Sequence, residues 1–186
     1  MKLLSIIMPT RSGSHDSLRK AVRSILDAPG TKRDDVEILL RLDDDDLSRL
    51  AVATELIQGV GRIFIGPRGK GYIEMGTFVN DLVKIADSQW CWLFDDDAWV
   101  EGNWHGPLSV MPRDCALNTQ AYKLGQSHYL NGVRGGCVGM LIPTDLAKTI
   151  NHVNPVDQQW HDIITQKGWT FRQLNATVYH HDGRAR

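Results

Sequence analysis

The sequence predicts an α/β fold in which helices flank a mostly parallel central sheet. Strand and helix patterns alternate three times before a fourth strand, which is typical of a parallel sheet covered by helices. Three predicted strands end in distinctive polar segments: acidic runs at 43–46 and 95–97, and a Gly-rich basic loop at 66–71. Ligands of open α/β sheets bind beyond the carboxyl ends of the strands, so these segments mark the expected site.

The first half of the chain carries the clearest elements. Leu3–Met8 is a short apolar run stopped by Pro9, which predicts a buried strand rather than a signal peptide. Helical spacing of apolar residues follows a serine-rich segment that offers an N-cap at 12–14. The further strands are expected at Val36–Leu42, Arg62–Ile65 and Trp90–Phe94, and the helices over 18–26, 47–57 and 75–86.

The second half is less regular. Strands are expected at Cys115–Leu124, His128–Leu130, Val138–Ile142 and Ala176–Tyr179. A short helix is expected to start at 143–145, and another at Pro155, capped by Asn154 and ended before Gly168. No linker is long enough to divide the chain, so residues 1–186 are expected to form one domain.

Composition and charge narrow the function classes. The formal net charge of −1 gives no indication of nucleic-acid binding or of an anionic membrane surface. No apolar run approaches the ~18 residues of a membrane span, so none is expected. The three cysteines have an odd count and no CxxC spacing, which argues against a zinc site or a disulfide framework. We expect a reduced, cytoplasmic location.

The run Asp95-Asp96-Asp97 is the strongest chemical signal. Adjacent carboxylates repel one another, and hard cations such as Mn²⁺ or Mg²⁺ prefer such oxygen ligands. If strand alternation continues through the run, Asp95 and Asp97 point the same way and Asp96 the other way. The alternative is a solvated acidic turn, which the flanking apolar and aromatic residues make less favourable.

The other polar segments allow two interpretations each. In Asp43–Asp46, Asp45 or Asp46 is expected to cap the next helix, whereas Asp43 or Asp44 suits a base or ribose. The loop at 66–71 offers backbone N–H groups, Arg68 and Lys70 to a diphosphate, or is a plain surface loop.

Two later segments carry candidate catalytic groups. His180 and His181 end a strand pattern, and one imidazole is a candidate metal ligand beside the acidic run. Asp157 and Asp162 lie on the helix predicted from 155, where either is a candidate general base or a solvated carboxylate.

The order of these segments resembles the family 2 glycosyltransferases of GT-A fold over nearly the whole chain. The matching motifs are Ser5–Arg11, ending a strand in Pro-Thr; Leu42-Asp43-Asp44; Asn80 in a helix; Leu93–Asp97, similar to the DxD motif; Gly135-Gly136-Cys137; Val156-Asp157 before Gly168; and Val178–His181. The family has Glu-Asp where this chain has Val156-Asp157, and Gly-Ser where it has Asp45-Asp46.

The resemblance implies a role for each matched position. Asp157 becomes the expected catalytic base, with Asp162 as the alternative, and the expected metal ligands are Asp95, Asp97 and His180, holding Mn²⁺ or Mg²⁺. The nucleotide and sugar are expected at Pro9, Thr10, Arg11, Asp43, Asp44, Lys70, Asn80, Asp95, Asp96, Gly135 and Gly136. Residues 1–100 would form the nucleotide-binding half, and 101–186 the acceptor and catalytic half.

The resulting expectation is a metal-dependent glycosyltransferase of the hexosyltransferase type. It would move a sugar from a nucleoside-diphosphate sugar, with a UDP-sugar favoured, to an acceptor hydroxyl with inversion. The alternatives are a sugar nucleotidyltransferase, a non-catalytic nucleotide- or sugar-binding domain, and a calcium-stabilised module. The chain lacks room for a large acceptor domain, so we expect a homo-oligomer or partner, or a small or exposed acceptor.

Overall fold

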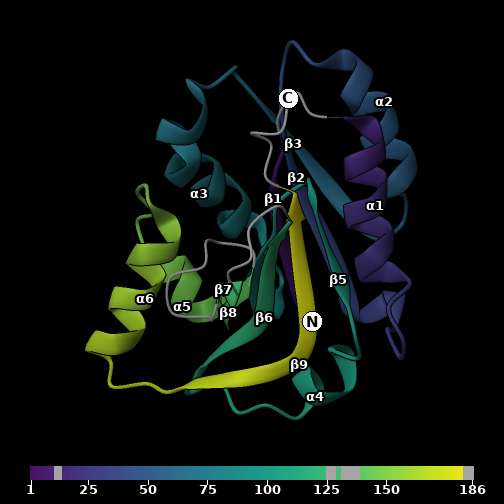
Figure 1. The fold of residues 1–186 in the computed structure, drawn as a ribbon. Coiled ribbons are helices and arrows are strands. Elements are labelled where there is room, and N and C mark those ends of the chain that lie inside the picture. The colour runs from purple at the N-terminus through teal and green to yellow at the C-terminus, as the bar shows by residue number, and fades with distance from the viewer. Residues whose placement is uncertain (11–13, 125–128, 131–138, 182–186) are drawn as a thin grey trace.

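The computed structural model describes residues 1–10, 14–124, 129–130 and 139–181. Its strands form one sheet in the order β3-β2-β1-β4-β8-β6-β9-β5, and β7 pairs with β6 beside that path. The strands are β1 Lys2–Pro9, β2 Val36–Asp43, β3 Gly61–Gly66, β4 Ser88–Leu93, β5 Ala98–Glu101, β6 Ala116–Leu124, β7 Tyr129–Leu130, β8 Met140–Pro143 and β9 Phe171–His181. The predicted α/β class is confirmed, with helices on both faces of the sheet (Figure 1).

The helices divide between the two faces. On one face, α1 His15–Leu26 and α2 Leu47–Leu56 pack with α4 His105–Ser109 over a core that includes Ile6, Ile38 and Trp92. On the other face, α3 Met75–Ile85, α5 Thr144–Thr149 and α6 Val156–Gln166 enclose a second core. Figure 1 shows the two groups of helices on opposite sides of the strands. The short 3₁₀ segments are η1 Arg33–Asp35 and η2 Gly71–Glu74.

The first four strands are parallel and place their carboxyl ends at one edge. Their pairing brings Pro9 opposite Arg41, Asp43 opposite Gly66, and Ile7 opposite Leu93. The acidic runs and the Gly-rich loop therefore meet at this edge, as the sequence predicts. We call it the carboxyl edge.

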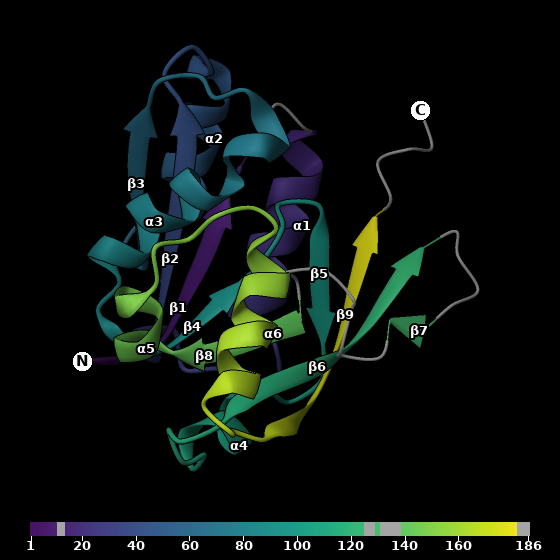
Figure 2. The same cartoon turned by 90° about the vertical axis from the view of Figure 1, so that its left-hand side faces the viewer.

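The second half extends the sheet with mixed pairing. β8 is antiparallel to β4, β6 is antiparallel to β8, and β9 is parallel to β6. Figure 2 shows β6 and β9 running side by side away from the parallel strands. The sequence pattern does not predict β5 or α4, and β9 begins at residue 171, five residues before the expected start at 176. Both missed elements are too short for a clear periodic pattern.

Helix ends follow the predicted chemistry with one shift. The Ser14 side chain caps α1 by accepting from the Asp16 N–H, and Asp46 caps α2 by accepting from the Arg49 N–H. Helix α6 begins at Val156 with Pro155 as its N-cap, one residue later than expected. None of the helices in the described ranges combines the length and apolarity needed to cross a membrane.

A buried polar network holds the amino ends of the parallel strands together. The Glu37 carboxylate is 5% exposed and accepts hydrogen bonds from the Ser5 hydroxyl at 2.5 Å and the Asp87 N–H at 2.6 Å. Arg62 pairs with its other oxygen at 2.8 Å. The Ser5 hydroxyl also lies 2.6 Å from that of Ser88. Each oxygen of this buried carboxylate therefore has a partner within the protein.

Candidate functional site

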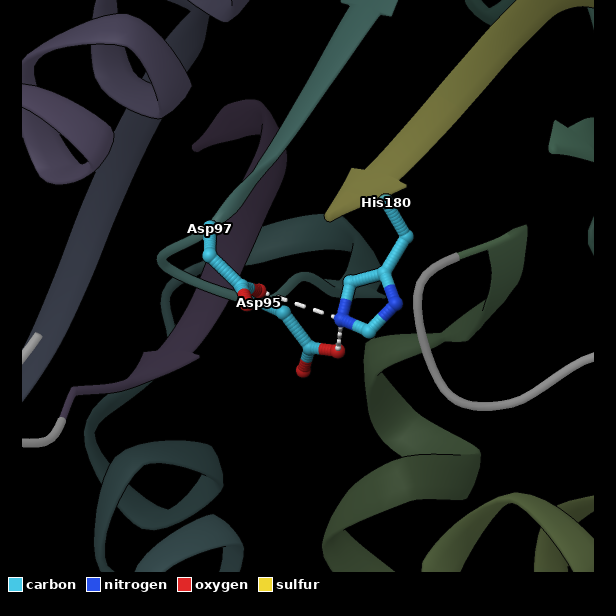
Figure 3. Close-up of side chains that lie close together, drawn as sticks. All are labelled: Asp95, Asp97 and His180. Carbon is cyan, nitrogen blue, oxygen red and sulfur yellow. Dashed lines mark ion pairs between the residues drawn. The ribbon is translucent and has the colours of Figure 1, made fainter. Parts of the chain in front are cut away.

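Asp95, Asp97 and His180 meet at the carboxyl edge, and all three are partly buried (Figure 3). His180 Nε2 lies 3.0 Å from Asp95 Oδ2 and 3.1 Å from Asp97 Oδ1. One ligand atom from each residue lies within 4.8 Å of the others. The two aspartates thus form one cluster with a histidine that follows Asp97 by 83 positions (180 − 97) in the sequence, and we call it the Asp-Asp-His cluster.

A tight turn brings the two carboxylates together. Strand β4 ends at Leu93, and the Ala98 N–H donates to the Asp95 carbonyl at 3.2 Å before β5 begins. Because β5 pairs with β9, Ala98 lies opposite His180, which places the imidazole over the turn. The predicted common direction of Asp95 and Asp97 agrees with the structure. Its cause is the turn rather than strand alternation.

The electrostatics of the cluster suit a cation. Burial lowers the pKa of His180, but hydrogen bonds to Asp95 and Asp97 and their charges raise it to about 10 overall. The imidazolium thus offsets the charge of the two carboxylates. Two carboxylate oxygens and one imidazole nitrogen are a donor set that Mn²⁺ accepts, with further positions left for water or phosphate oxygens. The residues present therefore fit a divalent ion, once His180 Nε2 is deprotonated.

Asp96 faces away from the cluster. Its Oδ2 accepts a hydrogen bond from the guanidinium of Arg49, which lies on α2 and is buried. Arg49 thereby ties the acidic turn to α2. Asp96, expected among the nucleotide-binding residues, makes a structural ion pair in this arrangement.

Asp43 is held by a buried arginine at the end of β2. The Arg41 guanidinium is 3% exposed and donates through Nη1 to Asp43 Oδ1. Through Nη2 it donates to the Pro67 carbonyl at 2.5 Å. Its Cζ lies 4.0 Å from the ring centroid of Phe78 on α3. Arg41 therefore joins the end of β2 to the Gly-rich loop and to α3.

The Gly-rich loop packs closely on the same structure. A Cβ at Gly69 would lie 2.1 Å from the Phe78 ring, so only glycine fits there. The Lys70 N–H donates to Glu74 Oε2 at 2.7 Å, and Arg68 pairs with Asp45 at 2.6 Å. Close packing therefore explains the glycine at position 69. The backbone N–H of Lys70 donates to a side chain within the protein rather than to a diphosphate.

The remaining residues of the edge are placed as follows. Pro9 ends β1, and the Thr10 N–H donates to the Arg41 carbonyl at 2.9 Å. Thr10 Oγ1 is buried and has no hydrogen-bond partner within the described ranges. Asp44 is exposed, and its N–H donates to the Gly66 carbonyl at 2.9 Å. Arg11 lies outside the described residues.

Asn80 faces the segment that connects α5 to α6. Its Oδ1 accepts from His152 Nδ1 at 2.8 Å and from the His152 N–H at 2.9 Å, and its Nδ2 donates to the His152 carbonyl at 3.1 Å. Burial lowers the pKa of His152 to about 4. A Cβ at Gly76 would lie 2.5 Å from the His152 carbonyl oxygen, so α3 approaches this segment closely. In this structure Asn80 holds the segment at 152, and its expected role in nucleotide binding stays a prediction.

The two candidate bases lie on α6. Asp157 is in its first turn, and its side chain is outside what the structure describes. Asp162 is exposed and accepts from Gln158 Nε2 at 2.7 Å on the same helix. Gly135 and Gly136, expected near the sugar, also lie outside the described residues.

Three residues that hold the site together, Arg41, Arg49 and His152, are not among those expected from the sequence. Arg41 carried a usable signal, because a charged residue inside the apolar run 36–42 must find a buried partner. Arg49 and His152 carried none, since both acquire their partners from elements distant in sequence.

A doubly covered α/β sheet with carboxylates and a histidine at its carboxyl edge defines a nucleotide-sugar transferase fold of the GT-A class. The chain belongs to the glycosyl transferase family 2, whose sequence pattern matches residues 5–109, more than half of its length. A comparison with curated protein sequences found no match.

Solved structures share the fold. S. aureus TarS, residues 1–349 in complex with UDP, is 12% identical with a TM-score of 0.74, and the match covers 97% of this chain and 60% of that one. The same TarS fragment with UDP-GlcNAc is 14% identical with a TM-score of 0.69, over 100% of this chain and 60% of that one. GalNAc-T7 with UDP, GalNAc and Mn²⁺ is 12% identical with a TM-score of 0.71, over 99% of this chain and 45% of that one. The chain spans about half to three fifths of the length of these proteins.

Proposed function

We propose that this chain is a metal-dependent hexosyltransferase that uses a nucleoside-diphosphate sugar, with a UDP-sugar favoured, and glycosylates an acceptor hydroxyl. The observation that carries the proposal is the Asp-Asp-His cluster at the carboxyl edge of a family 2 sheet. The complexes of similar folds with UDP, UDP-GlcNAc and Mn²⁺ support the donor and the metal.

The donor would lie along the carboxyl edge. Asp43 is half-buried at the end of β2 and would accept a hydrogen bond from the base, beside Pro9 and Thr10. The diphosphate would lie toward Asp95, Asp97 and His180, where a bound Mn²⁺ or Mg²⁺ would neutralise charge on the leaving group. Lys70 would contribute a further positive charge from the loop.

The transfer would use one carboxylate base. Asp157, with Asp162 as the alternative, would take the proton of the acceptor hydroxyl. The acceptor oxygen would then bond to the anomeric carbon while the bond from that carbon to the phosphate oxygen breaks, releasing the nucleoside diphosphate. A single displacement of this kind inverts the anomeric configuration.

A nucleotide and metal panel tests the proposal before the acceptor is known. Thermal unfolding would be recorded with UDP, GDP, CMP and ATP, each with and without Mn²⁺. We expect a rise in Tm with UDP that requires Mn²⁺, because a ligand bound only by the folded state stabilises it. No rise with any nucleotide would contradict a donor site, and a rise with Ca²⁺ alone would favour a calcium-stabilised module.

The base is tested separately by donor hydrolysis and transfer. We expect Asp157→Ala to retain the Tm rise with UDP and Mn²⁺ but to lose turnover by roughly 100-fold or more. Asp162→Ala is the matched variant on the same helix, and full turnover there would exclude it as the base. Full turnover in the Asp157 variant together with loss in the Asp162 variant would reverse the assignment.

A further inference from the structure

We infer that Asn80 is a positioning residue that fixes the first turn of α6, where Asp157 lies. This role rests on the proposed function, which makes Asp157 the base. Asn80 would act on that base through the segment 151–153, which lies between α5 and α6, rather than through contact with the donor.

Asn80 holds His152 through both ends of its amide. Its Oδ1 accepts hydrogen bonds from the His152 N–H at 2.9 Å and from Nδ1 at 2.8 Å, and its Nδ2 donates to the His152 carbonyl at 3.1 Å. Two of these bonds are to the backbone of His152, and the third is to its ring. A donor and an acceptor on one planar amide therefore fix both the position and the direction of this backbone relative to α3.

The same segment packs directly on the backbone of α3. A Cβ at Gly76 would lie 2.5 Å from the His152 carbonyl oxygen and 2.7 Å from Val153 Cα, so only glycine fits there. Gly76 is in the first turn of α3, and α3 follows the Gly-rich loop of the carboxyl edge. Figure 2 shows the connection from α5 to α6 passing beside α3 before α6 begins. The segment is therefore held at the end of α3 that lies nearest the carboxyl edge.

Helix α6 binds the same segment from its own side. Gln159 Oε1 accepts from the Val153 N–H at 3.0 Å, and Gln159 Nε2 donates to the Asn151 carbonyl at 2.9 Å. Gln159 follows Asp157 by two positions in the sequence. Asn80 on α3 and Gln159 on α6 therefore hold one short segment between them, which links the first turn of α6 to α3.

The ring of His152 adds a packing contact to this link. It lies 5.9 Å from the ring of Trp160 on α6, measured between centroids, and both side chains are buried. The N-cap residue of α6 is Pro155, whose side chain has no oxygen to accept from the first N–H groups of the helix. The start of α6 therefore depends on its contacts with the segment 151–153.

A shift of the base should affect turnover far more than donor binding. A general base acts only within hydrogen-bond reach of its proton, and a misplacement of ~1 Å can cost ~100-fold in rate. We expect Asn80→Ala to lower kcat for donor hydrolysis roughly tenfold or more. The KM of the donor and the dissociation constant of UDP in Mn²⁺ should stay within about twofold of wild type, since neither reports the position of the base.

The experiment measures hydrolysis of UDP-GlcNAc, UDP-glucose and UDP-galactose in Mn²⁺, together with isothermal titration of UDP. It compares wild type with Asn80→Ala, Asp157→Ala and the double variant. If Asn80 acts through Asp157, the double variant should hydrolyse the donor as slowly as Asp157→Ala alone, because residues that act as one unit are not additive. A double variant that is slower by the full Asn80→Ala factor would overturn the inference and leave the proposed function standing.

Lys84→Ala is the matched control on α3. Lys84 is exposed, lies one turn beyond Asn80, and makes no hydrogen bond to the segment 151–153 in the described part of the chain. We expect this variant to keep wild-type kcat and UDP affinity.

Gln159→Ala repeats the test from the other helix and carries it alone if Asn80→Ala does not fold. Gln159 is only partly buried, and its loss should lower kcat in the same way while UDP affinity is kept. Wild-type kcat in this variant would overturn the inference. Loss of UDP affinity in Asn80→Ala but not in Gln159→Ala would assign Asn80 to the nucleotide and also overturn it. Absence of UDP binding and turnover in wild type would overturn the proposed function and the inference with it.

Discussion

Carboxylates at the two ends of the parallel strands have different surroundings. At the amino end, Glu37 is 5% exposed, and two hydrogen-bond donors and Arg62 satisfy both of its oxygens. At the carboxyl edge, the side chains of Asp95 and Asp97 are 30% and 33% exposed and share one histidine. A carboxylate whose partners all lie within the chain contributes to stability, whereas one that stays partly open is available to a ligand. Burial together with partners inside the chain, rather than charge alone, therefore separates the structural carboxylate Glu37 from the candidate ligands Asp95 and Asp97.

Removing a carboxylate from the carboxyl edge should affect function far more than folding. We expect Asp97→Ala to abolish the Mn²⁺-dependent Tm rise with UDP and to lower sugar transfer at least ~100-fold. The free energy of unfolding should change by less than about 1 kcal/mol, because Asp97 is one third exposed. Donor hydrolysis would measure the loss of activity, and urea denaturation of the same preparation would measure the change in the free energy of unfolding.

Asp45→Ala is the control for that variant. Asp45 lies at the same edge but pairs with exposed Arg68. The variant should therefore keep the wild-type Tm rise with UDP and Mn²⁺ and the wild-type rate of sugar transfer. An Asp97 variant whose free energy of unfolding falls by several kcal/mol would contradict this expectation, because the cluster would then be structural.

Removing the carboxylate at the amino end should have the opposite result. We expect Glu37→Ala to lower the free energy of unfolding by about 3 kcal/mol, since it leaves buried donors without an acceptor. UDP affinity should stay within about twofold of wild type in the fraction that is folded. Urea denaturation would compare the unfolding free energy of this variant with that of Glu55→Ala. Glu55 is an exposed carboxylate 3.8 Å from Arg19. Equal stability of the two variants would show that the amino-end network is not stabilising.

His152 contributes an effect that depends on pH, because it is a buried group that is neutral in the folded protein. Burial lowers its pKa to about 4, below the ordinary value of about 6.5. The unfolded chain therefore binds a proton at pH values where the folded chain does not. The contribution of His152 to stability is complete above pH ~6.5 and is lost as the pH falls toward 4, by at most ~1.4 kcal/mol per pH unit.

The test is the difference in unfolding free energy between wild type and His152→Leu, measured from pH 7.5 to 4.5. We expect wild type to lose its advantage as the pH falls below 6.5. A difference that is constant with pH would mean that His152 titrates normally in the folded protein.

Much of the first half could be predicted because its signals are local. The parallel strands, α1 to α3 and the caps at Ser14 and Asp46 follow from apolar periodicity and from the preference of short polar side chains for helix starts. The placement of 43–46, 66–71 and 95–97 at one edge follows from parallel pairing. In the second half, β5 and α4 were missed, and the division into two functional halves stays a prediction.

The fold class, the family resemblance and the residue types at the carboxyl edge can be read from the sequence, because they depend on patterns within short segments. The tertiary structure sets how the charges at this edge are paired. It joined Asp95 and Asp97 to His180 through the pairing of β5 with β9, and it gave Asp96 to Arg49 and Asp43 to Arg41. The partners of His180 and of Asp96 come from separate elements, so these pairs depend on packing rather than on spacing along the chain. Arg41 and Asp43 lie on the same strand, and contacts of Arg41 with the Pro67 carbonyl and the Phe78 ring fix its guanidinium there.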